Sequence, residues 1–287
     1  MKKLKILFVT VIAFILTMNV SAQDVISVAD AAVKLKEKKT TVFVDCRKAK
    51  FYKKRHIKNA VNLEHKKLYK EGPVKSMLKS PQEIAKIFGK LGISESKTVI
   101  LYDDGKGKYS GRIYWILKYL GAKDVKVLDG HIKAWQGARK PVTMAATMAR
   151  KTAFTPKLHA NYLAQITDVK KAINNKQCVI VDVRAANEFN GSDESELRKG
   201  HIPSAINLEF KNVLNAKGEL KSNEDLKSVF ESAGITSDKE VILYCASSVR
   251  AGIVFMALHS GLQYPKVKVY DGAFYEWEAD SKNEVVK

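Results

Sequence analysis

The chain has 287 residues, of which 46% are hydrophobic and 28% charged, so it is long enough for two ordinary domains with buried cores. That composition excludes extensive disorder. The formal net charge is +20, with the surplus lysines spread along the sequence, and a strongly positive surface attracts small anions. No basic stretch is interleaved with aromatic residues in the manner of a nucleic-acid-binding module, so we expect no nucleic-acid partner.

Residues 1–22 are typical of a secretory signal peptide. Three lysines within the first five residues precede an apolar run over 6–16, and small residues follow at 20–22. The run is short for a membrane span, so we expect cleavage, with an uncleaved anchor as the alternative. The mature chain would begin near Gln23 with a net charge of +17 after loss of those three lysines. We expect it to be periplasmic or secreted, without stable membrane insertion.

The two halves of the chain carry the same motifs in the same order. Residues 42–47, 56–64 and 99–103 match 179–184, 201–209 and 241–245, and Asp129-Gly130 with Trp135 matches Asp271-Gly272 with Trp277. Chance similarity does not keep order and spacing across four motifs. The sequence therefore predicts one module written twice, with both tryptophans in the core.

Each module alternates short apolar strands with helical segments, which predicts an α/β domain with a largely parallel, buried sheet flanked by helices. The segment Ser80-Pro81-Gln82-Glu83 predicts the capped start of a helix that runs through Lys90. Residues 141–157 contain two prolines and predict a linker. The expected strands are 42–45, 99–102 and 125–128 in an N-terminal domain over 23–140, and 179–182, 241–244 and 267–270 in a C-terminal domain over 158–287.

Cys245 is the predicted nucleophile. An odd cysteine count leaves at least one thiol free in an exported protein. Cys46 and Cys178 lie in apolar strand patterns and are expected to be small buried hydrophobes. Cys245 instead follows the strand 241–244 and precedes a predicted helix, so the backbone N–H groups of the turn face its sulfur. Such a position favours the thiolate, the nucleophilic form of cysteine.

The residues after Cys245 offer groups that bind an anion. Arg250, with four residues in between, is expected to favour the thiolate and to receive an anionic donor, and the alternative is an ion pair at the start of the helix. The expected hydroxyl donors are Ser247 and Ser248, and the expected backbone amides are those of Ala246 and Val249.

These motifs together resemble the rhodanese family, and specifically its tandem-domain sulfurtransferases that act on thiosulfate or 3-mercaptopyruvate. The resemblance rests on Asp-x-Arg, His-Ile-Pro-x-Ala, the cysteine loop and 271–277, and it covers nearly the whole mature chain. It implies two tandem rhodanese-like domains, of which the first has Asp103 in place of Cys245 and is non-catalytic. It also implies that a persulfide on Cys245 carries sulfur from a small anionic donor to cyanide or a thiol, with no metal or organic cofactor. We expect the active site at the cleft between the domains.

The family pattern is incomplete around the loop, so the sequence does not decide which sulfur donor the protein uses. Thiosulfate enzymes of the family place basic residues directly after the cysteine and mercaptopyruvate enzymes place Gly-Ser-Gly there, whereas this chain has 246–248 as Ala-Ser-Ser. Arg250 stands where both groups usually carry threonine and is typical of single-domain rhodaneses. Glu188 stands where the family often carries a donor-binding arginine, and we expect Arg198 to compensate.

Three further residues near the predicted loop have expected roles. Arg184 is placed near the active loop by the resemblance, as a further donor-binding candidate. Its neighbour Asp182 is expected to form an internal ion pair. His201 has a repeat partner, His56, in the module that lacks a nucleophile, so we expect a structural histidine in a turn.

We expect a thiosulfate sulfurtransferase, with a 3-mercaptopyruvate sulfurtransferase or a non-enzymatic persulfide carrier as alternatives. Cysteine phosphatases and arsenate reductases on related folds separate Cys and Arg by five residues. The four residues between Cys245 and Arg250 form a smaller loop that suits sulfur better than phosphate. The glycine-rich loop 103–108 lacks the spacing of a phosphate-binding motif, so it predicts no nucleotide site.

Overall fold

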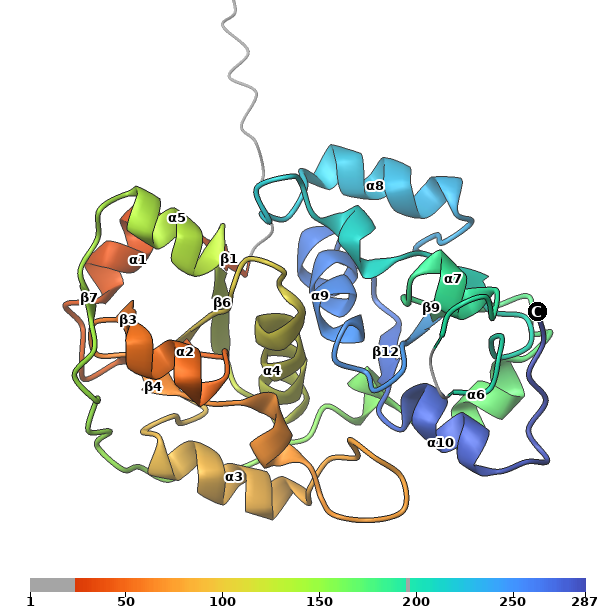
Figure 1. Cartoon of the computed structure of the whole chain (residues 1–287), viewed down its shortest axis with the longest axis horizontal. Coiled ribbons are helices and arrows are strands. Elements are labelled where there is room, and N and C mark those ends of the chain that lie inside the picture. Colours follow the sequence, from red (N-terminus) through yellow and green to blue (C-terminus); the bar gives the residue numbers. More distant parts are fainter. Residues whose placement is uncertain (1–23, 195–196) are drawn as a thin grey trace, which may run out of the picture.

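The computed structural model describes residues 24–194 and 197–287, so the expected signal peptide lies outside the described residues. Two α/β domains lie side by side (Figure 1). None of the described helices is long and apolar enough to cross a membrane.

Each domain is built on a five-stranded sheet in which all neighbouring strands are parallel. The first sheet has the order β1-β6-β5-β2-β4, and the second has the matching order β8-β12-β11-β9-β10. The predicted duplication and parallel sheets are therefore confirmed. The strands of the first sheet are β1 (Val25–Ile26), β2 (Thr41–Asp45), β4 (Val61–Asn62), β5 (Thr98–Tyr102) and β6 (Asp124–Leu128), and those of the second are β8 (Leu163–Ala164), β9 (Cys178–Asp182), β10 (Ile206–Asn207), β11 (Glu240–Tyr244) and β12 (Val267–Tyr270). A small antiparallel pair joins β3 (His56–Ile57) to β7 (Val142–Thr143).

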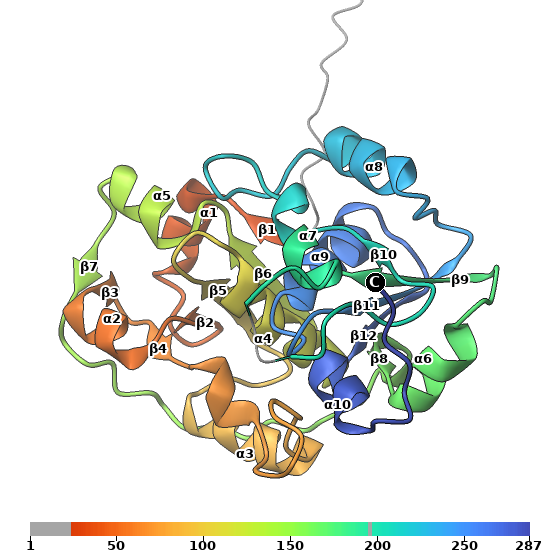
Figure 2. The same cartoon turned by 45° about the vertical axis from the view of Figure 1, so that its right-hand side comes forward.

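Helices cover both faces of each sheet (Figure 2). Successive side chains of a strand point to opposite faces, so each face of the sheet carries apolar side chains that the helices bury. In β5, for example, Val99 and Leu101 pack on one side with helices α3 (Pro81–Lys90) and α4 (Lys108–Tyr119), whereas Ile100 packs on the other with α1 (Val28–Lys34) and α5 (His131–Gly137). The N-terminal domain has α1 (Val28–Lys34), α2 (Ala49–Lys54), α3 (Pro81–Lys90), α4 (Lys108–Tyr119), α5 (His131–Gly137) and the short 3-10 helix η1 (His65–Leu68); the C-terminal domain has α6 (Ile166–Ala172), α7 (Ala186–Phe189), α8 (Asn223–Ser232), α9 (Ala251–Met256), α10 (Ala273–Ala279) and η3 (Phe210–Val213).

Local sequence signals fix several of these boundaries. Ser80 caps α3 and forms a capping box with Glu83, and Pro81 is the first helical residue, as predicted. Trp135 and Trp277 are 0% and 2% exposed, which confirms their place in the core.

The two domains meet where α4 crosses α9, and glycines make this approach possible. A methyl group at Gly111 would lie 2.4 Å from the backbone nitrogen of Ile253, and one at Gly252 would lie 2.3 Å from the carbonyl oxygen of Gly111. Side chains of both helices belong to one continuous apolar core, so the domains share an interface of buried apolar residues.

An ion pair reinforces the contact between the domains. Asp271, at the end of β12, accepts a hydrogen bond at 2.5 Å from Arg112 of α4 and another at 2.9 Å from the backbone N–H of Leu78. The side chain of Arg112 is fully buried. The sequence analysis identified Asp271 only as part of the repeated motif, and its role between the domains was not predicted.

Candidate active site

Cys245 begins a short loop that is held in place by the neighbouring helix and strand. The loop runs from the end of β11 to Arg250, the residue before α9, and Cys245 is 1% exposed. The carbonyl oxygen of Cys245 accepts the N–H of Phe274 at 3.0 Å. At the bend, Ser248 adopts a left-handed φ of 54° and donates its hydroxyl to the carbonyl of Tyr270. These contacts fix both the start of the loop and its bend.

The equivalent loop of the N-terminal domain shows what this turn does to an anion. Asp103 stands at the end of β5, in the place that Cys245 takes after β11. Its carboxylate accepts four backbone N–H groups, those of Gly105, Gly107, Tyr109 and Ser110, at 3.0 to 3.2 Å. Burial alone would raise the pKa of Asp103, but His131 and these N–H groups lower it. The strand-to-helix turn therefore gathers backbone dipoles around a negative charge.

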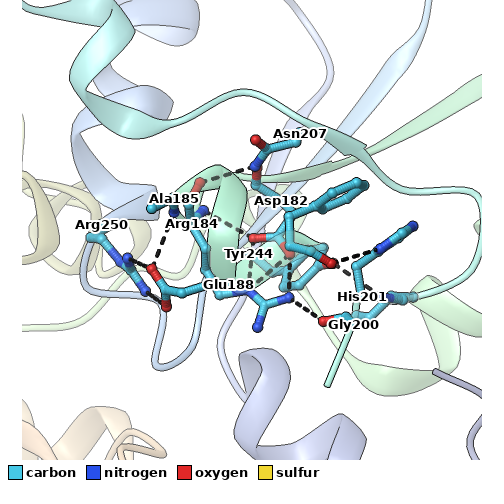
Figure 3. A network of polar contacts seen from close by, with 11 residues as sticks. Asp182, Arg184, Ala185, Glu188, Gly200, His201, Asn207, Tyr244 and Arg250 are labelled. Carbon is cyan, nitrogen blue, oxygen red and sulfur yellow. Dashed lines mark hydrogen bonds and ion pairs between the residues drawn. The ribbon is translucent and has the colours of Figure 1, made fainter. Parts of the chain in front are cut away.

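Arg250 lies beside the thiol and is also paired with a carboxylate. Its guanidinium binds Glu188 through two hydrogen bonds of 2.5 and 2.8 Å (Figure 3). Burial alone would lower the pKa of Arg250, but hydrogen bonding and charge from Glu188 and Cys245 raise it. Burial likewise opposes the ionisation of Glu188, yet Arg250 lowers the pKa of that carboxyl. The ion pair that was the alternative for Arg250 is therefore present, and the expected role of Arg250 toward a donor anion stays a prediction.

A cavity of about 540 Å³ lies between the domains at this loop. We call it the cleft cavity. One wall comes from the C-terminal domain, through Ser247, Val249, Arg250 and Glu188. The other comes from the N-terminal domain and is rich in lysines, namely Lys48, Lys66, Lys106 and Lys108. Among the described residues none of these four lysines has a carboxylate within ion-pair distance. The lining has six lysine and arginine side chains against the three carboxyls of Glu64, Glu188 and Glu209, so its net charge is positive.

His65 is a histidine that lines the cleft cavity. It shares a hydrogen bond of 2.8 Å with the hydroxyl of Tyr69 and stacks on Tyr109. Burial, together with the charges of Arg112 and Lys66, lowers the pKa of His65 to about 4. The ring is therefore neutral at neutral pH, and it adds a polar group without adding charge.

The structure places only some of the predicted donor-binding residues at the cleft cavity. Ser247 lines it, whereas Ser248 is fully buried and uses its hydroxyl on Tyr270. The guanidinium of Arg198 donates to the carbonyl of Asn283 at 2.9 Å, away from the cleft. It does not face Glu188 there, so the expected compensation finds no support in the geometry.

Arg184 also lies outside the cleft cavity lining. It is 1% exposed and binds Asp182 at 2.6 Å and the carbonyl of Gly200 at 2.7 Å (Figure 3). This confirms the internal ion pair predicted for Asp182, and it engages Arg184 in the same pair. The hydrogen bond from Arg184 to the carbonyl of Gly200 also fixes the start of the segment that follows Gly200.

The two repeat histidines have matching structural contacts. His201 is bonded to the carbonyl of Phe189 at 3.0 Å and stacks on that ring, and His56 is bonded in the same way to the carbonyl of Tyr52 at 2.8 Å. Neither lines the cleft cavity. The structural role predicted for His201 is confirmed.

The other two thiols differ from Cys245 in their surroundings. Cys46 is 1% exposed, and burial with the charge of Asp103 raises its pKa well above the ordinary value. Cys178 is only partly buried, contrary to the expectation of a buried hydrophobe, because it opens β9 at the end of the sheet. Burial and the charge of Glu240 raise its pKa to about 11. Among the described residues no cluster of three or more His, Cys, Asp or Glu side chains is arranged to hold a metal ion.

The lysines of the cleft cavity and His65 were not predicted as site residues, although the position of these lysines just after strands could have indicated them. Lys48 follows β2, Lys66 follows β4, and Lys106 and Lys108 follow β5. Because the carboxyl ends of parallel strands meet at one edge of the sheet, residues just after each strand converge there.

Comparison with known proteins agrees with this architecture. Residues 28–138 and 165–280 each match the family model described as Rhodanese-like domain. The chain belongs to the rhodanese family. It is a sulfurtransferase by that membership, and 3-mercaptopyruvate and thiosulfate sulfurtransferases are among the proteins it resembles.

Named relatives cover most of this rhodanese. It is 33% identical over 235 residues to the 3-mercaptopyruvate sulfurtransferase of Escherichia coli K12, covering 80% of this chain and 83% of that protein. It is 33% identical over 247 residues to a putative thiosulfate sulfurtransferase of Mycolicibacterium smegmatis, covering 83% and 88%. The crystal structure of SseA from Escherichia coli superimposes with a TM-score of 0.80 at 30% identity, covering 87% of this chain and 98% of that one.

Proposed function

We propose that this rhodanese transfers the outer sulfur of thiosulfate to cyanide or a thiol through a persulfide on Cys245. The observation that supports this best is the charge around the loop. Arg250 lies beside the thiol, and four lysines without carboxylate partners face it across the cleft cavity. A small dianion is drawn to such a cavity more strongly than a monoanion.

The reaction consists of two displacements at sulfur. The Cys245 thiolate attacks the outer sulfur of thiosulfate, a new S–S bond forms, and sulfite leaves with the electron pair of the broken bond. The acceptor then attacks the terminal sulfur of the persulfide, and Cys245 leaves as a thiolate. Arg250 and the loop amides stabilise the negative sulfur in both steps. Neither step needs a proton from the protein.

Two alternatives share the same persulfide. The loop residue Ser247 fits the position of a serine in mercaptopyruvate enzymes, and 3-mercaptopyruvate would bring one carboxylate to the cleft cavity. A relative from Thermus thermophilus, 32% identical over 234 residues, is named sulfur carrier protein TtuD. This name supports a non-enzymatic carrier as the second alternative. A carrier would load sulfur once per chain and would not turn over alone.

Steady-state sulfur transfer to cyanide from thiosulfate and from 3-mercaptopyruvate, measured side by side, tests the proposal. We expect a higher kcat/KM with thiosulfate, no turnover by Cys245→Ser, and a loss of about tenfold or more in Arg250→Ala because a transition-state charge contact is removed. Lys227→Ala, which changes an exposed side chain of α8, serves as the control. Unchanged thiosulfate turnover in Arg250→Ala, or preference for 3-mercaptopyruvate, would overturn the thiosulfate assignment.

We also propose that the protein acts outside the cytoplasm. Residues 1–22 support this through their charge and apolar pattern. Amino-terminal sequencing of the protein from the expressing cells tests it. A start near Gln23 agrees with export and cleavage, and a start at Met1 on a chain found in the cytoplasmic fraction contradicts export.

A further inference from the structure

A second cavity lies in the N-terminal domain, at the opposite end of the sheet from the cleft cavity. Its volume is about 620 Å³. Thr41, the first residue of β2, lines this cavity, whereas Cys46, just beyond the last residue of β2, lines the cleft cavity. The length of the strand, about 3.3 Å per residue, separates the two.

The walls of this second cavity come from several segments. They include the end of α1, the start of β2, residues 59–61, the residues after α3, and residues 147–152, which belong to the segment that runs past α3 toward the C-terminal domain (Figure 1). We call this cavity the basic groove. Residues 147–152 are held to α3 by a hydrogen bond of 2.9 Å from the backbone N–H of Thr152 to the carbonyl of Gly89.

Positive side chains surround the basic groove. Its described lining contains no aspartate or glutamate and has six cations, namely Lys34, Lys38, Lys39, Lys97, Arg150 and Lys151. Lys34 is paired with Glu37 at 3.0 Å, and Lys97 donates to the carbonyl of Gly92 at 2.8 Å. Among the described residues the other four have no carboxylate within ion-pair distance. Their mutual repulsion is relieved when an anion binds among them.

The basic groove also offers apolar and hydrogen-bonding groups. Leu35 and Val42 contribute apolar surface to its walls, and Met148 is 97% exposed. Thr41 is 7% exposed, and its hydroxyl has no hydrogen-bond partner within the described residues. An unpaired buried polar group is uncommon in native proteins and is consistent with a ligand site.

We propose that the basic groove binds an organic anion that carries two or more negative charges beside an apolar group. The volume falls within the range of about 300 to 1,000 Å³ that is typical of small-molecule sites. The cations provide charge complementarity, and the apolar walls provide a surface for the rest of the ligand. The concave shape favours a small molecule over the surface of an acidic protein.

Calorimetric titration of the Cys245→Ser chain tests this inference without sulfur chemistry. The titrants are ADP, which has both charge and an aromatic group, inorganic pyrophosphate, which has charge alone, and adenosine, which has the aromatic group alone. We expect ADP to bind more tightly than pyrophosphate and adenosine to show no binding. Vesicles of anionic phospholipid show whether a lipid headgroup can supply the same charge.

Three double variants locate the site. Lys38→Glu with Lys39→Glu should weaken ADP binding by about tenfold or more, since two unpaired cations are reversed. Lys53→Glu with Lys54→Glu makes the same change in net charge on exposed α2 and should alter it by less than about threefold. Lys106→Glu with Lys108→Glu changes the cleft cavity and should also leave it nearly unaltered.

Several results would overturn the inference. One is no heat of binding with either anion. A second is equal weakening by the groove variant and the α2 variant, which would indicate attraction by net charge alone. A third is weakening by the cleft variant only. A fourth is binding of a hexaglutamate peptide but not of ADP, which would assign the basic groove to an acidic protein partner.

Discussion

Arg250 and Glu188 form a two-point ion pair at the wall of the cleft cavity, with hydrogen bonds of 2.5 and 2.8 Å. Both side chains are 20% exposed, so the pair stands at the border between protein and solvent. Charge and hydrogen bonding from Glu188 and Cys245 raise the pKa of Arg250, so its guanidinium is near the thiol while both of its terminal nitrogens hold the carboxylate of Glu188. A donor anion that approaches Cys245 meets Arg250 already in contact with this negative group.

Glu188→Gln should therefore improve the use of thiosulfate. The change removes one negative charge from the cleft cavity at nearly constant shape and leaves Arg250 with a neutral partner. We expect kcat/KM for thiosulfate to rise by about three- to tenfold, mainly through a lower KM, with the gain shrinking at high salt. Glu209→Gln, another carboxyl of the cavity that is paired with Lys211 at 2.7 Å, should have a smaller effect. A fall in kcat/KM would show instead that the carboxylate is needed to hold Arg250 in place.

Asp103→Ala should destabilise the N-terminal domain. Four backbone N–H groups and the hydroxyl of Ser110 lose their acceptor in a buried loop. We expect a loss of about 3 to 5 kcal/mol in the free energy of unfolding, measured by urea denaturation at pH 7.

The carboxylate of Asp103 should also make the free energy of unfolding depend on pH. Because the pKa of Asp103 is lower in the folded protein than its ordinary value of 3.8, the stability it contributes is present above that value. That stability is lost as the pH falls through the folded-state pKa. The difference in unfolding free energy between the wild type and Asp103→Ala should therefore shrink at strongly acid pH. A difference that stays constant down to the acid end would contradict the contribution of the ionised form.

Gly111→Ala tests the contact between α4 and α9. A methyl group there meets the backbone of Ile253, so the helices must separate, and we expect a loss of about 1 to 3 kcal/mol in stability together with a lower rate of sulfur transfer. Gly137→Ala is the matched control, since nothing lies within 4 Å of its added methyl group in α5. That control should be neutral or stabilising by up to about 1 kcal/mol. Equal thermal unfolding of the two variants would show that the helices tolerate separation.

The strands and the nucleophile could be predicted from sequence because their signals are local. Apolar runs such as 241–244 are too short for helices and recur at the same spacing in both halves, and Cys245 directly follows one of them. The prediction of the nucleophile needed only neighbouring residues, and the repeat supported the strands. The parallel order followed from the alternation of strands and helices.

The contact between the domains and the surroundings of the site depend on residues far apart in the chain. Arg112 and Asp271 are separated by 159 positions, and nothing near either residue in sequence indicates their pairing. Arg198 was expected to replace a missing donor-binding arginine, but its guanidinium is bonded to the carbonyl of Asn283, 85 positions away. Position along the chain did not indicate the direction of that side chain.

The most direct test of the central claim is mass spectrometry of the chain after treatment with thiosulfate. The peptide that contains Cys245 should gain the mass of one sulfur atom and lose it again on addition of cyanide. The Cys245→Ser chain should gain nothing, and the peptides of Cys46 and Cys178 should stay unchanged. A treated chain without added sulfur on the Cys245 peptide, or with that sulfur on another cysteine, would contradict a persulfide on Cys245.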